Sequence, residues 1–126
     1  MNVEPMSQTD HCPVLIVEDD EDLRDMMAQL LTIEGFDAAA VANGREALEY
    51  LRGSTRPHVI LLDLMMPVMD GWEFRRQQKA NPELAPVPVI VLSALDPSRA
   101  AVDATAFIKK PLDFDRLLEL VRIHCR

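Results

Sequence analysis

The sequence predicts one domain of the α/β class, in which a parallel sheet of five strands lies between two layers of helices. First, the chain has 126 residues, a length that suits one ordinary domain, and 48% of them are hydrophobic, enough to build a core. Second, short apolar runs recur, three of them rich in Val and Ile, which is typical of strands buried on both faces. Third, helical patterns fill the gaps, and this alternation indicates right-handed strand–helix–strand units.

The expected strands are five apolar runs. They cover residues 14–17, 36–42, 59–62, 89–92 and, more weakly, 107–108. Five strands in a chain of this size are typical of a flavodoxin-like fold with strand order 2-1-3-4-5. In such sheets ligands bind at the carboxyl ends of the strands, near the switch point between strands 1 and 3. The residues that directly follow each apolar run are therefore the candidates for function.

Apolar spacing and capping residues predict the helices between the strands. The first helix should end at Gly35, the second should begin after Asn43 and end near Gly53, and the last should begin after Asp113. The apolar residues of the first helix recur at helical spacing. They are Leu23, Met26, Met27, Leu30 and Leu31.

Composition excludes some classes of partner and location. The chain carries 13 Lys and Arg against 21 Asp and Glu, a net charge of -8, so we expect no direct nucleic-acid binding and no binding to anionic membranes. No apolar run is long enough to span a bilayer. Residues 1–12 contain no apolar stretch and predict a loose tail, not a signal peptide, before a domain at 13–126.

The two cysteines, Cys12 and Cys125, are too few for a disulfide framework. We therefore expect free thiols and a reducing, cytoplasmic location. Both chain ends should lie on the face opposite the functional edge. The minor alternative there is a disulfide between the two cysteines, or a metal site that the cysteines form with His11 and His124.

Polar residues follow four of the expected strands. An acidic turn at 18–22 follows the first, Asp63 the third, Ser93 the fourth and Lys110-Pro111 the fifth. Carboxylates gathered at one edge repel one another, and a hard cation such as Mg²⁺ would relieve that repulsion and leave room for a phosphoryl oxygen. A carboxylate beside such a cation can attack phosphorus and give an acyl phosphate.

These residues resemble the response-regulator receiver domain of two-component signalling, in particular single-domain receivers of the chemotaxis type. The most specific segment is 63–71, Asp-Leu-Met-Met-Pro-Val-Met-Asp-Gly. The acidic turn, the Ser93-Ala94 pair and the Lys110-Pro111 pair fall in the expected order, and the resemblance covers about residues 13–125.

The resemblance implies a role for each site residue. Asp63 would accept the phosphoryl group and bind Mg²⁺ together with Asp19, with the main-chain carbonyl of Met65, and with Glu18 through a water. In receivers an arginine often stands five positions after the second acid of this pair. Arg24 stands five positions after Asp19, so the resemblance makes Glu18 and Asp19 the pair. Ser93 and Lys110 would bind phosphoryl oxygens, Phe107 would follow Ser93 on switching, and Pro111 would follow a cis peptide bond.

The implied function is that of a phospho-accepting switch and not of an enzyme with turnover. A histidine kinase or a histidine phosphotransfer protein would deliver the phosphoryl group, docking at Leu23, Met27 and Leu112, and an unidentified protein would read the switch. Two alternatives stay open. One is a Mg²⁺-dependent phosphatase of the haloacid-dehalogenase type, suggested by Asp20-Glu21-Asp22, although Arg24 stands where that family has a hydroxyl residue. The other is a receiver-like scaffold without phosphorylation.

The sequence departs from the family between Ser93 and Lys110, a segment several residues shorter than receivers usually have. Asp96 and Pro97 can begin a helix there, but few residues remain before the next strand. We therefore expect a fourth helix of one to two turns at most, and a monomer, because the face that many receivers use to dimerise would be truncated.

Overall fold

A computed structural model describes residues 11–53 and 56–125. Its five strands form one parallel sheet in the order β2-β1-β3-β4-β5, so the predicted flavodoxin-like topology is confirmed. The strands are β1 (Pro13–Val17), β2 (Asp37–Val41), β3 (Val59–Asp63), β4 (Val89–Ser93) and β5 (Ala106–Lys109). The helices are α1 (Glu21–Ile33), α2 (Gly44–Leu51), α3 (Gly71–Ala80), α4 (Pro97–Ala100) and α5 (Phe114–His124).

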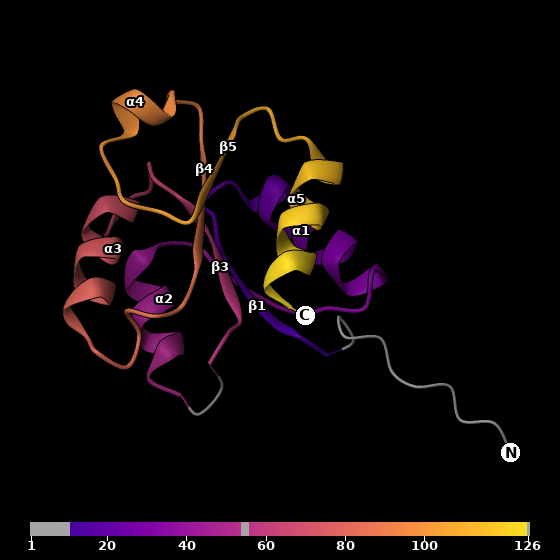
Figure 1. Cartoon of the computed structure of the whole chain (residues 1–126), viewed down its shortest axis with the longest axis horizontal. Helices are drawn as coiled ribbons and strands as arrows, with labels where there is room; N and C mark the ends of the chain where they lie inside the picture. The colour runs from indigo at the N-terminus through magenta and orange to yellow at the C-terminus, as the bar shows by residue number, and fades with distance from the viewer. Residues whose placement is uncertain (1–10, 54–55, 126) are drawn as a thin grey trace, which may run out of the picture.

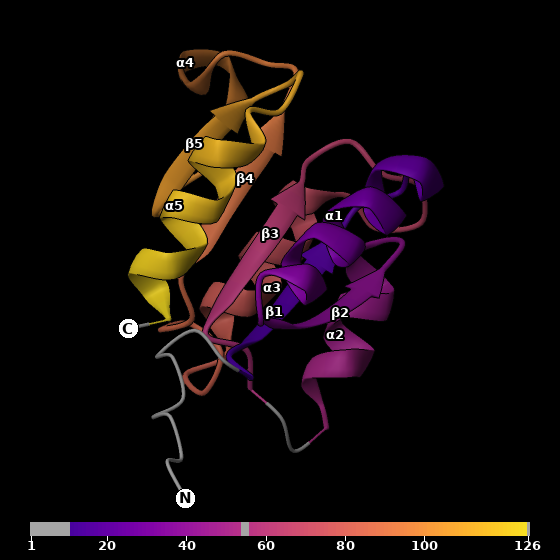
Figure 2. The same ribbon diagram turned by 90° about the vertical axis from the view of Figure 1, so that its right-hand side faces the viewer.

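The sheet is the middle of three layers. Helices α1 and α5 cover one face, and α2, α3 and the small α4 lie on the other (Figures 1 and 2). Successive residues of a strand point to opposite faces, so β1 feeds both halves of the core. Val14 and Ile16 join the cluster under α1 and α5, whereas Leu15 and Val17 join the cluster under α2 and α3. All residues of β3 and β4 are buried, which explains their continuous apolar sequence.

Side-chain caps begin the longer helices. Asp20, Asn43 and Asp113 each accept a hydrogen bond from the backbone N–H three residues on, at 3.1, 3.0 and 3.1 Å. The helix starts predicted after Asn43 and Asp113 are therefore confirmed. Asp70, the last acid of the segment that follows β3, caps α3 in the same way at 2.9 Å.

Helix α4 is a single turn of four residues, as the short segment predicted. Asp96 occupies the N-cap position but its side chain caps nothing, because its carboxylate pairs with Lys109 at 2.6 Å. Ala101 ends the turn in the left-handed conformation, with φ of 51°.

The loop that follows α4 is tied to α3. Trp72 donates its indole N–H to the carbonyl of Ala100. Arg75 donates to the carbonyl of Asp103 at 2.8 Å, and Lys79 pairs with the carboxylate of the same residue at 3.0 Å. Polar contacts from α3 thus hold the segment in which most receivers would continue α4.

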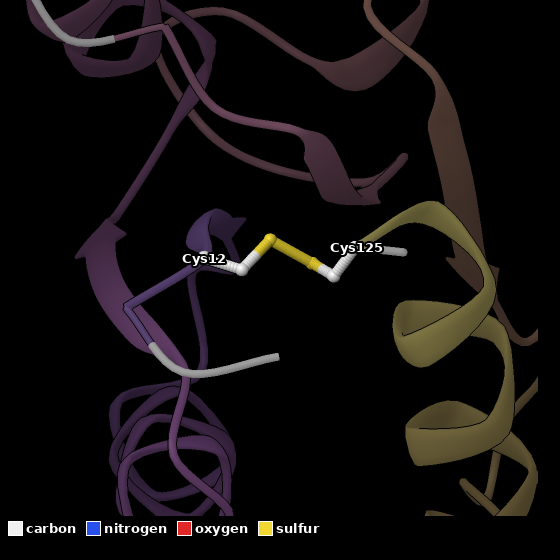
Figure 3. The surroundings of a disulfide bond; sticks show 2 residues. All are labelled: Cys12 and Cys125. Atoms are coloured by element: carbon white, nitrogen blue, oxygen red, sulfur yellow. A yellow bond between two sulfur atoms is a disulfide. The ribbon is translucent and has the colours of Figure 1, made fainter. Parts of the chain in front are cut away.

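The two ends of the domain are joined by a disulfide between Cys12 and Cys125 (Figure 3). The expectation of free thiols was therefore wrong. The two side chains are 5% and 4% exposed and belong to the core, so Cys12 is no part of a loose tail. Of the rest of that expected tail, residues 1–10 lie outside the described residues, and His11 is exposed in a turn. Within the described chain, no helix is both long and apolar enough to cross a membrane.

Candidate functional site

The carboxyl ends of the strands surround a hollow of about 270 Å³. The end of β1 contributes the acidic turn, β3 ends at Asp63, β4 ends at Ser93, and Lys110 follows β5. The topology therefore brings these residues together at the switch point between β1 and β3. The residues that line the hollow are Glu18, Asp19, Asp20, Asp63, Met65, Ser93, Ala94 and Lys110.

Three carboxylates gather at the hollow. Glu18, Asp19 and Asp63 each place one oxygen within 4.8 Å of the others. Glu18 is fully buried and Asp63 is 5% exposed, whereas Asp19 is exposed. Burial raises the pKa of Asp63 to about 7, with the charge of Glu18 adding to the effect and that of Lys110 opposing it. Clustered carboxylates with one open side fit a hard cation that keeps some of its waters.

Lys110 is the cation of the site. Its Nζ lies 2.7 Å from Oε1 of Glu18 and 3.5 Å from Oδ1 of Asp63. Burial alone would lower the pKa of Lys110, but the hydrogen bond to Glu18 and the charges of both acids raise it overall, so the ammonium form persists. The Lys110-Pro111 peptide bond is cis, and the backbone N–H of Lys110 donates to the carbonyl of Ser93 at 2.8 Å.

Ser93 is buried at the end of β4, and its Oγ accepts a hydrogen bond from the backbone N–H of Leu95 at 3.0 Å. Phe107 lies on β5 opposite Val91 of β4 and is half-buried against the cluster under α2 and α3. Ser93 and Phe107 thus lie on neighbouring strands, and Ser93 is two residue pairs nearer the hollow than Phe107.

The loop between β3 and α3 passes over the hollow. Met66 of this loop packs in the core, whereas Met65 is 64% exposed at the rim of the hollow. Gly71 begins α3 so close to β3 that a Cβ there would lie 2.5 Å from the carbonyl oxygen of Asp63. The glycine therefore allows α3 to begin directly behind the Asp63 backbone.

Arg24 has a contact that the sequence did not reveal. Its guanidinium donates to the carbonyls of Glu18 and Asp19 at 3.0 and 3.4 Å. This contact holds the backbone of the acidic turn, where several negative side chains crowd together. In the sequence, only the five-residue spacing between Asp19 and Arg24 pointed to a link between Arg24 and the acidic turn.

The structure also changes the expected docking surface. Met27 is fully buried in the core, so it cannot contact a partner, and its inclusion was wrong. Leu23 and Leu112 are half-buried. Met26, the neighbour of Met27, is the exposed methionine of α1.

The phosphatase alternative loses support, because the carboxylate of Asp20 is used to cap α1.

Residues 14–122 match the family described as the response regulator receiver domain. The DNA-binding response regulator MtrA of Mycolicibacterium paratuberculosis is 35% identical over 118 residues, which cover 90% of this chain and 51% of that protein. The chain spans about half the length of the first curated relatives that it matches.

Solved structures share the fold. The signal receiver domain of a signal transduction histidine kinase from Syntrophus aciditrophicus is 36% identical, with a TM-score of 0.81 over 90% of this chain and 89% of that one. The receiver domain of the sensor histidine kinase PA1611 from Pseudomonas aeruginosa PAO1, solved with a magnesium ion coordinated in its active site cleft, is 25% identical, with a TM-score of 0.82 over 91% and 98%. Because the family match spans most of the domain, this chain belongs to the response regulator receiver domain family of two-component signal transduction.

Proposed function

We propose that the chain is a phospho-accepting switch in which a histidine kinase or a histidine phosphotransfer protein delivers a phosphoryl group to Asp63. The observation that carries the proposal is the convergence of three carboxylates and one ammonium group on a single hollow at the strand ends. Glu18 and Asp63 are buried and Asp19 is exposed, and charged groups with perturbed pKa values that gather in a cleft are typical of functional sites.

The donor set fits Mg²⁺. Asp19 and Asp63 would bind it directly with the main-chain carbonyl of Met65, and Glu18 would act through a water. The ion would supply positive charge to the phosphoryl oxygens and keep Asp63 ionised. The magnesium-bound PA1611 receiver supports this assignment by similarity.

Transfer needs a free carboxylate and a stabilised phosphoryl group. An oxygen of Asp63 forms the bond to phosphorus as the bond from phosphorus to the donor histidine nitrogen breaks, and the nitrogen keeps the electron pair. Lys110 is near enough to Asp63 to turn from Glu18 toward a phosphoryl oxygen. The Ser93 hydroxyl, now held by Leu95, would then donate to another oxygen, and Phe107 would follow inward.

The partner that reads the switch is a protein. The strong negative charge of this domain disfavours DNA, so the DNA binding named for MtrA is not assigned to these residues. Histidine kinases are the partners of receiver domains, and Leu23, Leu112 and the exposed Met26 offer apolar contacts for docking.

The test is phosphorylation by a small acyl-phosphate donor with Mg²⁺. The wild type should gain one acid-labile, hydroxylamine-sensitive phosphoryl group, and Asp63→Asn should gain none. Asp22→Asn is the matched control, because Asp22 is an exposed acid of the same acidic stretch that does not line the hollow. Label that persists in Asp63→Asn would overturn the assignment.

A second assay separates the switch from the phosphatase alternative. The chain should release no phosphate from a generic phosphomonoester under multiple-turnover conditions. Sustained turnover would support the phosphatase. A wild type that takes up no label from either an acyl phosphate or a phosphorylated kinase would support the scaffold.

A further inference from the structure

We propose that Cys12 and Cys125 are a reversible redox-modification site, at which thiol–disulfide exchange decides whether the start of β1 is covalently tied to the end of α5. Their Cα atoms lie 5.9 Å apart, inside the usual range for a disulfide, although 113 positions separate them in sequence. The chain has no other cysteine, so no competing intramolecular pair exists.

Both redox states are compatible with the fold. The two side chains lie in the apolar cluster that also contains Val14, Phe36 and Val121. A reduced cysteine behaves in such a place as a small hydrophobic residue, so opening the bond leaves the core filled. Helix α5 also contributes Leu117, Leu118, Leu120 and Val121 to this cluster, and these contacts do not depend on the bond. Reduction would therefore remove a covalent link and not the domain.

The position of the pair makes exchange feasible despite burial. A buried thiol reacts slowly, so the site has to open before it can exchange. Cys125 is the C-cap residue of α5, and its backbone N–H bonds only within the last turn, to the carbonyl of Arg122 at 3.2 Å. The same turn is tied to Glu34, the C-cap residue of α1, by an ion pair from Arg122 at 2.9 Å. Fraying of one helical turn would suffice to expose the sulfur.

A low-molecular-weight disulfide such as oxidised glutathione would oxidise the two protein thiols in two exchange steps. One protein thiolate attacks it, forming a mixed disulfide and expelling one glutathione thiolate. The second protein thiolate then attacks the protein sulfur, closes the intramolecular bond and expels the second glutathione. Two protein thiols lose two electrons, and one glutathione disulfide gains them. Reduced glutathione in excess reverses both steps.

Closing the bond constrains the unfolded chain more than the folded one. The ring encloses almost the whole domain, and long rings stabilise most in the chain-entropy description. For a domain of this size we expect the oxidised form to melt about 10 °C higher than the reduced form.

The cysteine pair lies at the amino end of β1, whereas the proposed phosphorylation hollow lies at the carboxyl ends of the strands. The redox site therefore does not depend on the proposed phosphorylation.

The test uses the purified full chain equilibrated with reduced and oxidised glutathione in varied ratio. Free thiols are counted by alkylation and mass spectrometry, and folding is followed by circular dichroism. The wild type should change from two free thiols to an internal disulfide with no attached glutathione, remain folded in both states and gain thermal stability on oxidation. Cys12→Ala and Cys125→Ala should melt at the same temperature in both buffers.

A separate experiment tests whether fraying of the last turn of α5 exposes the disulfide. Arg122→Gln removes the tie to Glu34 and should speed exchange by about twofold. Arg116→Gln, on the same helix with its partner Glu119 also on that helix, should leave the rate unchanged. Equal rates in the two variants would overturn this route.

Four results would overturn the proposal itself. The thiols could stay titratable in oxidising buffer, each cysteine could keep a separate glutathione, or the chain could cross-link into dimers. Unfolding of the wild type upon reduction would show that the bond is a permanent structural element and not a switch.

Discussion

Lys110 lies nearer to Glu18 than to Asp63: its Nζ is 2.7 Å from the Glu18 carboxylate and 3.5 Å from the Asp63 carboxylate. The lysine therefore mainly compensates the charge of the fully buried Glu18, and its attraction to the Asp63 carboxylate is weaker because the distance is longer. The same ammonium group therefore stabilises the resting fold and, in the proposed function, would also bind the phosphoryl group.

The first prediction follows from this shared role. Lys110→Ala should lower the free energy of unfolding by about 1–3 kcal/mol near neutral pH, because Glu18 stays buried without its cation. It should also slow phosphoryl uptake. Urea unfolding and acyl-phosphate labelling measure the two effects. Lys109→Ala is the control, since Lys109 pairs with Asp96 on the surface and should change stability by less than about 1 kcal/mol. Equal stability losses in both variants would contradict this role of Lys110.

The second prediction concerns pH. The pKa of Asp63 rises from 3.8 to about 7 on folding, so the folded state holds a proton that the unfolded state releases. Because the folded state binds more protons, the free energy of unfolding falls as the pH rises from about 4 to about 7 and then levels off. Asp63→Asn removes this loss and should be more stable than the wild type by about 2–4 kcal/mol near pH 8. Mg²⁺ should stabilise the wild type and not the variant.

Urea unfolding at several pH values checks this prediction, with Asp22→Asn as the control that keeps the wild-type slope. A wild type that gains stability between about pH 4 and about pH 7, relative to Asp63→Asn, would contradict the raised pKa.

The sequence predicted most of the fold because the signals were local. Alternating apolar runs define the strands, and capping residues such as Asn43 need contacts only three residues away. The strand-end rule then placed Asp63, Ser93 and Lys110 at one edge. Periodicity alone could not decide which side of α1 faces the sheet, and so Met27 was placed on the surface although it is fully buried.

Contacts between distant segments were not predictable in the same way. The bond between Cys12 and Cys125 depends on where both chain ends lie after folding, and composition argued against it. The bond from Trp72 to Ala100 depends on how far the chain travels after a single helical turn. Neither residue pair leaves a pattern in the sequence.

The third prediction tests backbone strain in the loop between β3 and α3. Val68 has a φ of 69°, a conformation that β-branched residues adopt only with strain, and its side chain is 76% exposed. Asn tolerates this conformation, so Val68→Asn should stabilise the domain by about 0.5–1 kcal/mol. Thermal unfolding measures the change. A loss of stability would show that the exposed valine makes a packing contact that outweighs the strain.

The fourth prediction concerns the lifetime of the acyl phosphate. Met65 is exposed at the rim of the hollow and cannot orient a water by hydrogen bonding. Met65→Asn should therefore speed dephosphorylation, by about two- to tenfold if the amide positions the attacking water. The decay of labelled protein after removal of the donor gives the rate. Val68→Asn is the matched control, because it places the same side chain on the same loop outside the hollow. A rate that is unchanged or slower for Met65→Asn alone would contradict this role.

The last prediction concerns assembly. Helix α4 has one turn, its end is bonded to Trp72 of α3, and the loop beyond it is held by Arg75. The face that α4, β5 and α5 form in many receivers is therefore short here, which reduces the area that a dimer could bury on it. The chain should sediment as a monomer both before and after phosphorylation on Asp63. Trp72→Phe, which keeps the ring but removes the bond to Ala100, should loosen the loop without creating a dimer. A dimer that appears only upon phosphorylation and buries this face would show that the loop beyond α4 replaces the missing helix as an interface.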